Sequence, residues 1–224
     1  MSSGVPDLEQ ALAQARVALE RIGLLLFSDP ALPSLVGIIV GEPLRRSWWG
    51  HPRGGLIYQA MNRVDDDPTV LSIKLVAGKV TYVHRRLWNA VYAIGISRDA
   101  WQLDDLSPAA RWLLTRVDAD GEVRADHVFV PAEVVPHTRV TDAARELERY
   151  LLVHATEVHT ESGAHAKVLQ TWPHWAAAAR AAPSQMTAEE ARTELEGAAG
   201  RLVAETVNGL ALLPWQSPSR RRRR

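Results

Sequence analysis

The side chains best suited to chemistry in this chain are the cations and aromatic rings gathered between Arg45 and Gly95. Long cationic side chains neutralise phosphates, and an exposed indole stacks on a base or wedges beside one. These residue types together predict contact with duplex DNA. The residues expected to make it are Arg45, Arg46, Trp48, Trp49, His51, Lys74, Lys79, His84, Arg85 and Arg86.

The charge distribution favours the same stretch. The 26 basic and 26 acidic residues cancel, but five of the bases are Arg220–Arg224, which leaves 21 basic against 26 acidic residues in positions 1–219. Between positions 36 and 98 the balance reverses, with nine basic against four acidic residues, a net charge of +5. A local excess of this kind indicates an anionic partner for one part of the chain.

Composition excludes several classes of protein. Without any cysteine the chain has no disulfide, no thiolate zinc site and no thiol nucleophile. No apolar run approaches the roughly 20 residues of a membrane span, and the first residues carry no export signal, so we expect a cytoplasmic protein with no membrane contact. No P-loop, GxGxxG, HExxH or GxSxG pattern is present, and we expect no cofactor.

Histidines and acids offer other chemistries. His51 or His84 could act as a general acid or base, but neither has a carboxylate nearby in sequence to orient it, and the catalytic residues are unknown. His154, His159 and His165 with Glu157 and Glu161 could gather a metal, but strand alternation puts His154 on the opposite face from Glu157 and His159. The run Asp65–Asp67 is typical of a solvated helix end, so no metal site is predicted.

The elements that must position the basic stretch can be predicted from periodicity. A helix with Asp7 as its N-cap occupies the N-terminal segment, residues 1–35, with its apolar pattern running on to Phe27. Residues 35–41 form either a buried strand or a helix end. The basic unit within 36–100 then contains a helix over 56–64, a hairpin over 70–84 and a helix from 85 to 95. This unit can be interpreted as a divergent winged helix.

The following segment has a more regular order. Ser107 and Pro108 begin a helix, a short segment follows at 124–130, Thr141 caps a helix over 142–153, and residues 154–172 form a second hairpin. This order is the winged-helix arrangement for a unit spanning 105–175, with 142–151 as its recognition helix and 157–169 as its wing. A C-terminal helix and tail occupy 184–219, before the basic end 220–224.

The charge of this second unit differs from that of the first. Positions 104–149 hold ten acidic against six basic residues, and the presumed recognition helix carries Asp142, Glu146 and Glu148. Acidic side chains repel phosphate, so this unit is expected to serve packing or dimerisation rather than DNA contact.

Two resemblances follow from these motifs. Residues 106–172 resemble the winged-helix DNA-binding superfamily. Trp48-Trp49 followed by residues 75–95, with Ala77-Gly78-Lys79-Val80 and His84-Arg85-Arg86, looks like a segment of the tandem winged-helix DNA glycosylases that unhook interstrand crosslinks. That resemblance implies DNA contact. The glycosylases carry a Gln-apolar-Gln catalytic motif, and this chain has only isolated glutamines.

We therefore expect an α+β, helix-rich chain of winged-helix units with β-hairpin wings. The leading hypothesis is a DNA-binding protein of DNA repair or transcription control. A DNA glycosylase-related hydrolase is the enzymatic alternative. The third hypothesis is a winged-helix module for protein interaction or dimerisation that does not bind DNA, and a homodimer is left open.

Overall fold

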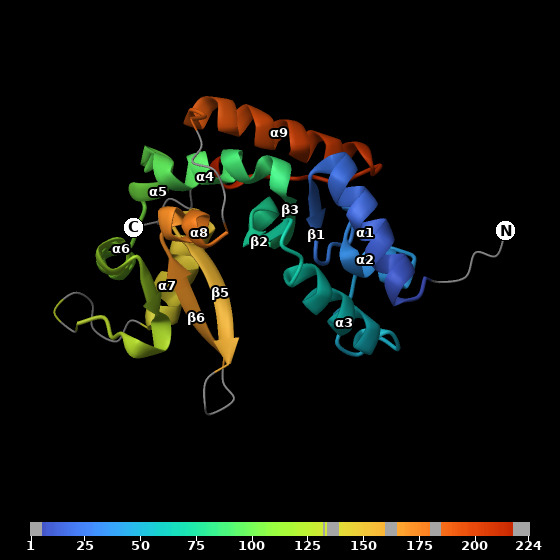
Figure 1. Cartoon of the computed structure of the whole chain (residues 1–224), viewed down its shortest axis with the longest axis horizontal. Coiled ribbons are helices and arrows are strands. Elements are labelled where there is room, and N and C mark those ends of the chain that lie inside the picture. Colours follow the sequence, from blue (N-terminus) through green and yellow to red (C-terminus); the bar gives the residue numbers. More distant parts are fainter. Residues whose placement is uncertain (1–5, 132, 134–138, 160–164, 180–184, 217–224) are drawn as a thin grey trace. The chain divides into compact units, whose positions relative to one another are not determined.

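The computed structural model describes residues 6–131, 133, 139–159, 165–179 and 185–216. Helices and two antiparallel three-stranded sheets make up these residues, which confirms the predicted α+β class (Figure 1). The chain divides into two compact units. The first holds the described residues up to Trp88 and those from Arg192 onward, and the second holds those between Asn89 and Ala191. The turn of the predicted second hairpin, most of 132–138 and the basic end 220–224 lie outside the described residues.

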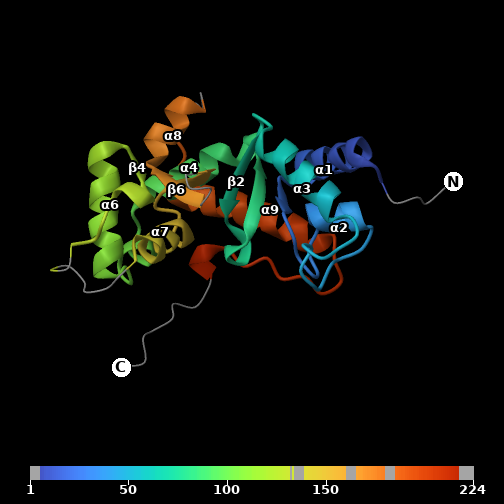
Figure 2. The ribbon, with the colours of Figure 1, turned by 90° about the horizontal axis from the view of Figure 1, so that it is seen from below.

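Three helices of the first unit pack on one another: α1 (Leu8–Ile22), α2 (Leu35–Val40) and α3 (Gly54–Asp65). Figure 2 shows them grouped together on one side of strand β2 (Val70–Lys74). The predicted Asp7 cap is present, since its side chain accepts from the Gln10 amide. The segment that could be strand or helix is helix α2, which Ser34 caps.

Strand β1 (Leu24–Leu26) corrects the expected length of the first helix. Gly23 adopts φ 95°, a left-handed conformation that favours glycine, and so ends α1. The three leucines that follow are fully buried and pair with strand β3 (Val80–His84), Leu25 opposite Tyr82. A short strand that is buried on both faces shows no alternation of apolar and polar residues. Its apolar run is therefore equally consistent with a continuation of the helix, as the sequence had indicated.

The predicted hairpin is confirmed as β2 and β3, with Leu71 opposite Val83. Its turn contains a 3₁₀ segment, Val76–Gly78, in which Ala77 and Gly78 have φ 50° and 69°. A second 3₁₀ segment, Arg85–Leu87, follows β3. The sheet order is β1-β3-β2, so the first strand of the unit pairs with its last.

The second unit repeats much of this order. After α4 (Trp88–Ser97), which begins at the unit boundary, and α5 (Ala100–Leu103), it runs through α6 (Pro108–Asp120), β4 (Glu122–Arg124), a 3₁₀ segment (Ala125–His127), α7 (Val140–Arg149), β5 (His154–His159) and β6 (His165–Gln170). Its sheet order is β4-β6-β5, so here too the first strand pairs with the last. Its core gathers residues such as Leu113, Leu147 and Leu169.

Two boundaries in the second unit differ from the predictions. Helix α7 begins at Val140, one residue before the expected cap Thr141, and Arg139 precedes it without a side-chain cap. Trp172, expected at the end of the hairpin, begins helix α8 (Trp172–Ala178), because Thr171 caps a new helix with its hydroxyl.

The C-terminal part of the chain returns to the first unit. Helix α9 (Ala188–Ala204) begins at the Thr-Ala-Glu-Glu motif, where Thr187 and Glu190 exchange hydrogen bonds. From Arg192 on, the residues belong to the first unit. Arg201 Nε donates to the Ile22 carbonyl at 3.1 Å, and beyond α9 the Leu212 carbonyl accepts from the Ala77 amide at 2.8 Å. A last 3₁₀ segment occupies Pro214–Gln216.

Candidate nucleic-acid interface

The loop between α2 and α3, residues 41–53, is anchored from below by one arginine and one tryptophan. The Arg53 guanidinium donates to the carbonyls of Ile39 and Pro6. The Trp48 ring packs edge-on against Phe27, with ring centroids 5.6 Å apart and an interplanar angle of 87°. Both contacts attach the loop to the rest of the first unit and so restrict the conformation of its backbone.

This loop exposes one aromatic ring and two cations. Trp49 is 73% exposed and stacks on Trp48, with ring centroids 4.3 Å apart and 22° between the planes. Arg45 and Arg46 are both exposed. The nearby exposed Glu42 offsets part of their charge. An indole held in place by a second indole loses little conformational entropy when it contacts a ligand.

His51 shapes the end of the loop where α3 begins. Its Nδ1 accepts from the Arg53 amide at 3.1 Å, and its carbonyl accepts from the Gly54 amide at 2.8 Å. These bonds close the turn that leads into the helix. His51 therefore has a clear structural task at the helix start.

The outward face of α3 was missed by the sequence analysis. Ile57, Ala60 and Val64 are buried, so the opposite side of the helix carries the polar residues. Tyr58 is 48% exposed, and Gln59 and Asn62 are exposed as well. Asn and Gln side chains can pair with adenine through two hydrogen bonds, which makes this face suited to reading base edges. The helical spacing opposite the predicted apolar stripe was the signal that could have identified it.

The other predicted cations differ in how much of their charge faces solvent. Lys79 Nζ lies 2.5 Å from Asp29 Oδ2, whose side chain is only 8% exposed. The Arg86 guanidinium donates to the carbonyls of Glu20 and Arg21 and so satisfies the C-terminal end of α1. Arg85 is exposed, and Lys74 is half-buried. Lys79 and Arg86 thus hold the first unit together, while Arg45 and Arg46 of the loop are exposed.

His84 lies at the end of β3, half-buried. Its Nδ1 accepts from the Arg86 amide at 3.4 Å. Burial and the nearby Arg86 guanidinium lower the pKa of His84 below its ordinary value. In the described part of the chain, no carboxylate hydrogen-bonds the imidazole of either His51 or His84, so neither has the oriented partner that a general base commonly uses.

The acids after α3 have separate local partners. Asp67 accepts from both the amide and the hydroxyl of Thr69. Burial of its carboxyl raises the pKa of Asp65 to about 6, although a hydrogen bond from Ser72 opposes that shift and the residue as a whole is exposed. Among the described residues, no three His, Cys, Asp or Glu side chains gather closely enough to hold a metal ion. Glu161 and the side chain of His159 lie outside that part of the chain.

The face of α7 in the second unit is less acidic than its sequence suggests. Glu146 accepts from the Ser107 amide and hydroxyl, at 2.8 and 2.6 Å. Glu148 lies 2.7 Å from Lys167, and both side chains are nearly buried, at 11% and 13% exposure. The exposed side chains of α7 include Arg145, which pairs with Asp142 at 3.3 Å, and Arg149. A count of charges along the segment therefore overstates the negative charge of its surface.

No protein-family model, curated protein or solved structure matches the chain. Separately, none of the helices in the described ranges is long and apolar enough to cross a membrane.

Proposed function

We propose that this chain is a tandem winged-helix protein that binds duplex DNA through its first unit. In both units the order helix, strand, helical turn, helix, hairpin is combined with pairing of the first strand to the last, which supports the winged-helix assignment. In this assignment α3 is the recognition helix of the first unit and α7 that of the second.

The observation that carries the DNA proposal is the fixed, outward-facing group at the start of α3. In helix-turn-helix proteins the recognition helix lies in the major groove, and its N-terminal residues reach the base edges. Here the loop that leads into that N-terminus exposes Arg45, Arg46 and Trp49, while Gln59 and Asn62 face outward along the helix. Arginines contact phosphates, amide side chains read bases, and the indole stacks or wedges.

Two cellular roles are consistent with the proposed DNA binding. DNA binding without a catalytic motif suits transcription control, or recognition of damaged DNA in repair. A glycosylase-related activity would need a base with an oriented partner near Trp49, and the described residues around His51 and His84 provide none. The enzymatic alternative is accordingly the weaker of the two.

A titration of fluorescent duplex DNA, followed by anisotropy, tests the proposal. The chain should first be shortened by Arg220–Arg224, because five consecutive arginines hold DNA without specificity. We expect the shortened chain to bind, and the pair R45Q/R46Q to bind more weakly. The pair R16Q/R21Q on α1 makes the same change of net charge elsewhere in the first unit and should leave affinity nearly unchanged.

The protein-interaction alternative predicts a different outcome. A shortened chain that elutes as a stable dimer and shows no saturable DNA binding at low salt would contradict the proposal. That result would instead assign the exposed Trp49 and Tyr58 to a protein interface.

A further inference from the structure

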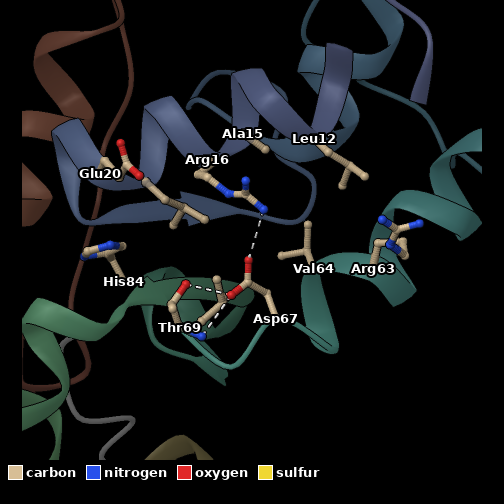
Figure 3. Close-up of a pocket in the computed structure, with 11 residues that line it drawn as sticks. Leu12, Ala15, Arg16, Glu20, Arg63, Val64, Asp67, Thr69 and His84 are labelled. Carbon is tan, nitrogen blue, oxygen red and sulfur yellow. Dashed lines mark hydrogen bonds and ion pairs between the residues drawn. The ribbon is translucent and has the colours of Figure 1, made fainter. Parts of the chain in front are cut away.

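A cavity of ≈ 290 Å³ lies within the first unit, between α1, the end of α3 and the ends of β2 and β3 (Figure 3). Small-molecule sites begin at about 300 Å³, so this volume suits a small ligand. The floor is apolar, because Ala15, Leu19 and Val64 line the cavity at 1%, 4% and 5% exposure. None of the lining residues belongs to the loop 41–53.

Two arginines at the rim have guanidinium groups that are only loosely paired. Arg16 lies 3.7 Å from Asp67, and Arg63 lies 3.9 Å from Glu9, both longer than a hydrogen bond. Their side chains are 69% and 60% exposed. Asp67, by contrast, is held by Thr69, which donates to it at 2.9 Å from the amide and 2.6 Å from the hydroxyl. The arginines therefore retain donors for an incoming anion, while both Thr69 bonds go to Oδ1 of Asp67 and its Oδ2 faces Arg16.

His84 and Glu20 lie at the opposite end of the cavity from Arg63 (Figure 3). The Nδ1 atom of His84 accepts from the Arg86 amide, so in the neutral ring the proton is on Nε2. That N–H is a further donor at the cavity wall. Glu20 is the one lining carboxylate at this end, and it would favour a ligand that carries an ammonium group there.

We propose that this cavity binds a small carboxylate with an apolar body, such as an arylalkanoate or an apolar amino acid. The apolar body rests on Ala15, Leu19 and Val64, and the carboxylate meets one of the rim arginines, Arg16 or Arg63. Charge-assisted hydrogen bonds from arginine suit the planar carboxylate, and the floor excludes ligands that are polar throughout. This site is independent of the proposed DNA contact.

Calorimetric titration of the full chain tests the proposal with four probes: benzoate, phenylacetate, 3-methylbutanoate and L-phenylalanine. At least one should bind saturably with one site per chain. Three control compounds each lack one feature of the proposed ligand: phenylacetamide lacks the charge, acetate lacks the apolar body, and inorganic phosphate lacks the planar carboxylate. Each should bind about tenfold more weakly than the best of the four probes, or worse. Preference for phenylalanine over phenylacetate would assign Glu20 to an ammonium group, and the reverse preference would assign a simple carboxylate.

The variant pair R16Q/R63Q should lose about tenfold or more in affinity, while R116Q/R145Q makes the same charge change at exposed arginines of the second unit and should bind normally. Both pairs alter exposed side chains, and amide spectra of the unaltered chain add a readout that needs no variant: the probe should shift the resonances of Ala15, Val64 and Thr69. No saturable binding of any of the four probes, equal binding of acetate or phosphate, or shifts confined to residues outside the cavity would overturn the proposal. None of these results would bear on DNA binding.

Discussion

The indole of Trp49 stacks on that of Trp48 with ring centroids 4.3 Å apart, and the two rings have different surroundings. Trp48 packs against Phe27 and the core of the first unit, while Trp49 is 73% exposed. Trp48 thus packs inside the first unit, while Trp49 offers an exposed ring for contact with a ligand. Sequence analysis could identify the pair, but not which of the two rings faces solvent.

The tryptophan pair should respond differently to truncation. Trp48→Ala should lower the free energy of unfolding by roughly 1–3 kcal/mol, because a packed ring is removed. Trp49→Ala should change it by no more than about 0.5 kcal/mol and should instead weaken DNA binding by about 1–3 kcal/mol. Urea denaturation and DNA titration of both variants measure these effects. Equal destabilisation by the two substitutions would contradict the assigned roles.

The outward face of α3 should affect sequence preference more than overall affinity. Replacing Gln59 or Asn62 by alanine should reduce discrimination between preferred and altered base pairs by about 1–3 kcal/mol, since a two-bonded contact to a base edge is lost. Selection from a random duplex library, repeated with each variant, measures the change. Gln14 is an exposed amide on α1, and Gln14→Ala is the matched control. Unchanged preferences in all variants would exclude α3 as the reader.

Lys79 should act in folding rather than in DNA binding. Burial by itself would raise the pKa of Asp29, but hydrogen bonds from the Leu32 amide, Lys79 and the Ala31 amide hold it below its ordinary value. Lys79→Ala removes one of these and should cost roughly 1–3 kcal/mol of stability, and a double-mutant cycle with Asp29→Asn should show coupling. DNA affinity of the shortened chain should change little.

The sign of the pH dependence at Asp29 follows from its lowered pKa. The folded protein binds this proton less tightly than the unfolded chain does, so the stability it contributes is fully present above the ordinary value of 3.8. That contribution is lost as the pH falls through 3.8 toward the folded-state value. In Lys79→Ala the loss should be smaller. An identical acid profile for the variant and the unaltered chain would argue against the pairing.

His154 should give the second unit a pH dependence near neutrality. The residue is 6% exposed, its ring contacts those of both Trp172 and Trp175, and burial lowers its pKa, although Gln170 and Glu148 oppose the shift. Between the folded value and the ordinary 6.5, the unfolded chain binds more protons, so stability should be greatest above 6.5 and fall as the pH falls.

Denaturation of the His154→Gln variant across about pH 5–8, the range in which histidine titrates, measures that dependence, which should become flatter than in the unaltered chain. His174, whose side chain is 45% exposed, supplies the control His174→Gln, and this variant should keep the original slope. A slope unaffected by His154→Gln would place the responsible group elsewhere.

Much of the local structure could be predicted, because it depends on local signals. The Asp7 and Ser107 caps, the apolar stripe of α3 and the alternation of the 70–84 hairpin all depend on neighbouring residues. Strand β1 was missed because its partner β3 lies far along the chain. The tasks of the cations were hidden for the same reason: Asp29 and the Glu20 carbonyl lie 50 and 66 positions from Lys79 and Arg86.

The most direct test of the central claim, that the loop before α3 binds phosphates, is the salt dependence of DNA affinity. For the chain shortened by Arg220–Arg224, the logarithm of the binding constant should fall linearly with the logarithm of salt concentration. Each phosphate contact contributes about 0.9 to that slope, so R45Q/R46Q should reduce its magnitude by about 2, while R16Q/R21Q should leave it unchanged. The same slope in all three proteins, or no binding at low salt, would contradict the claim.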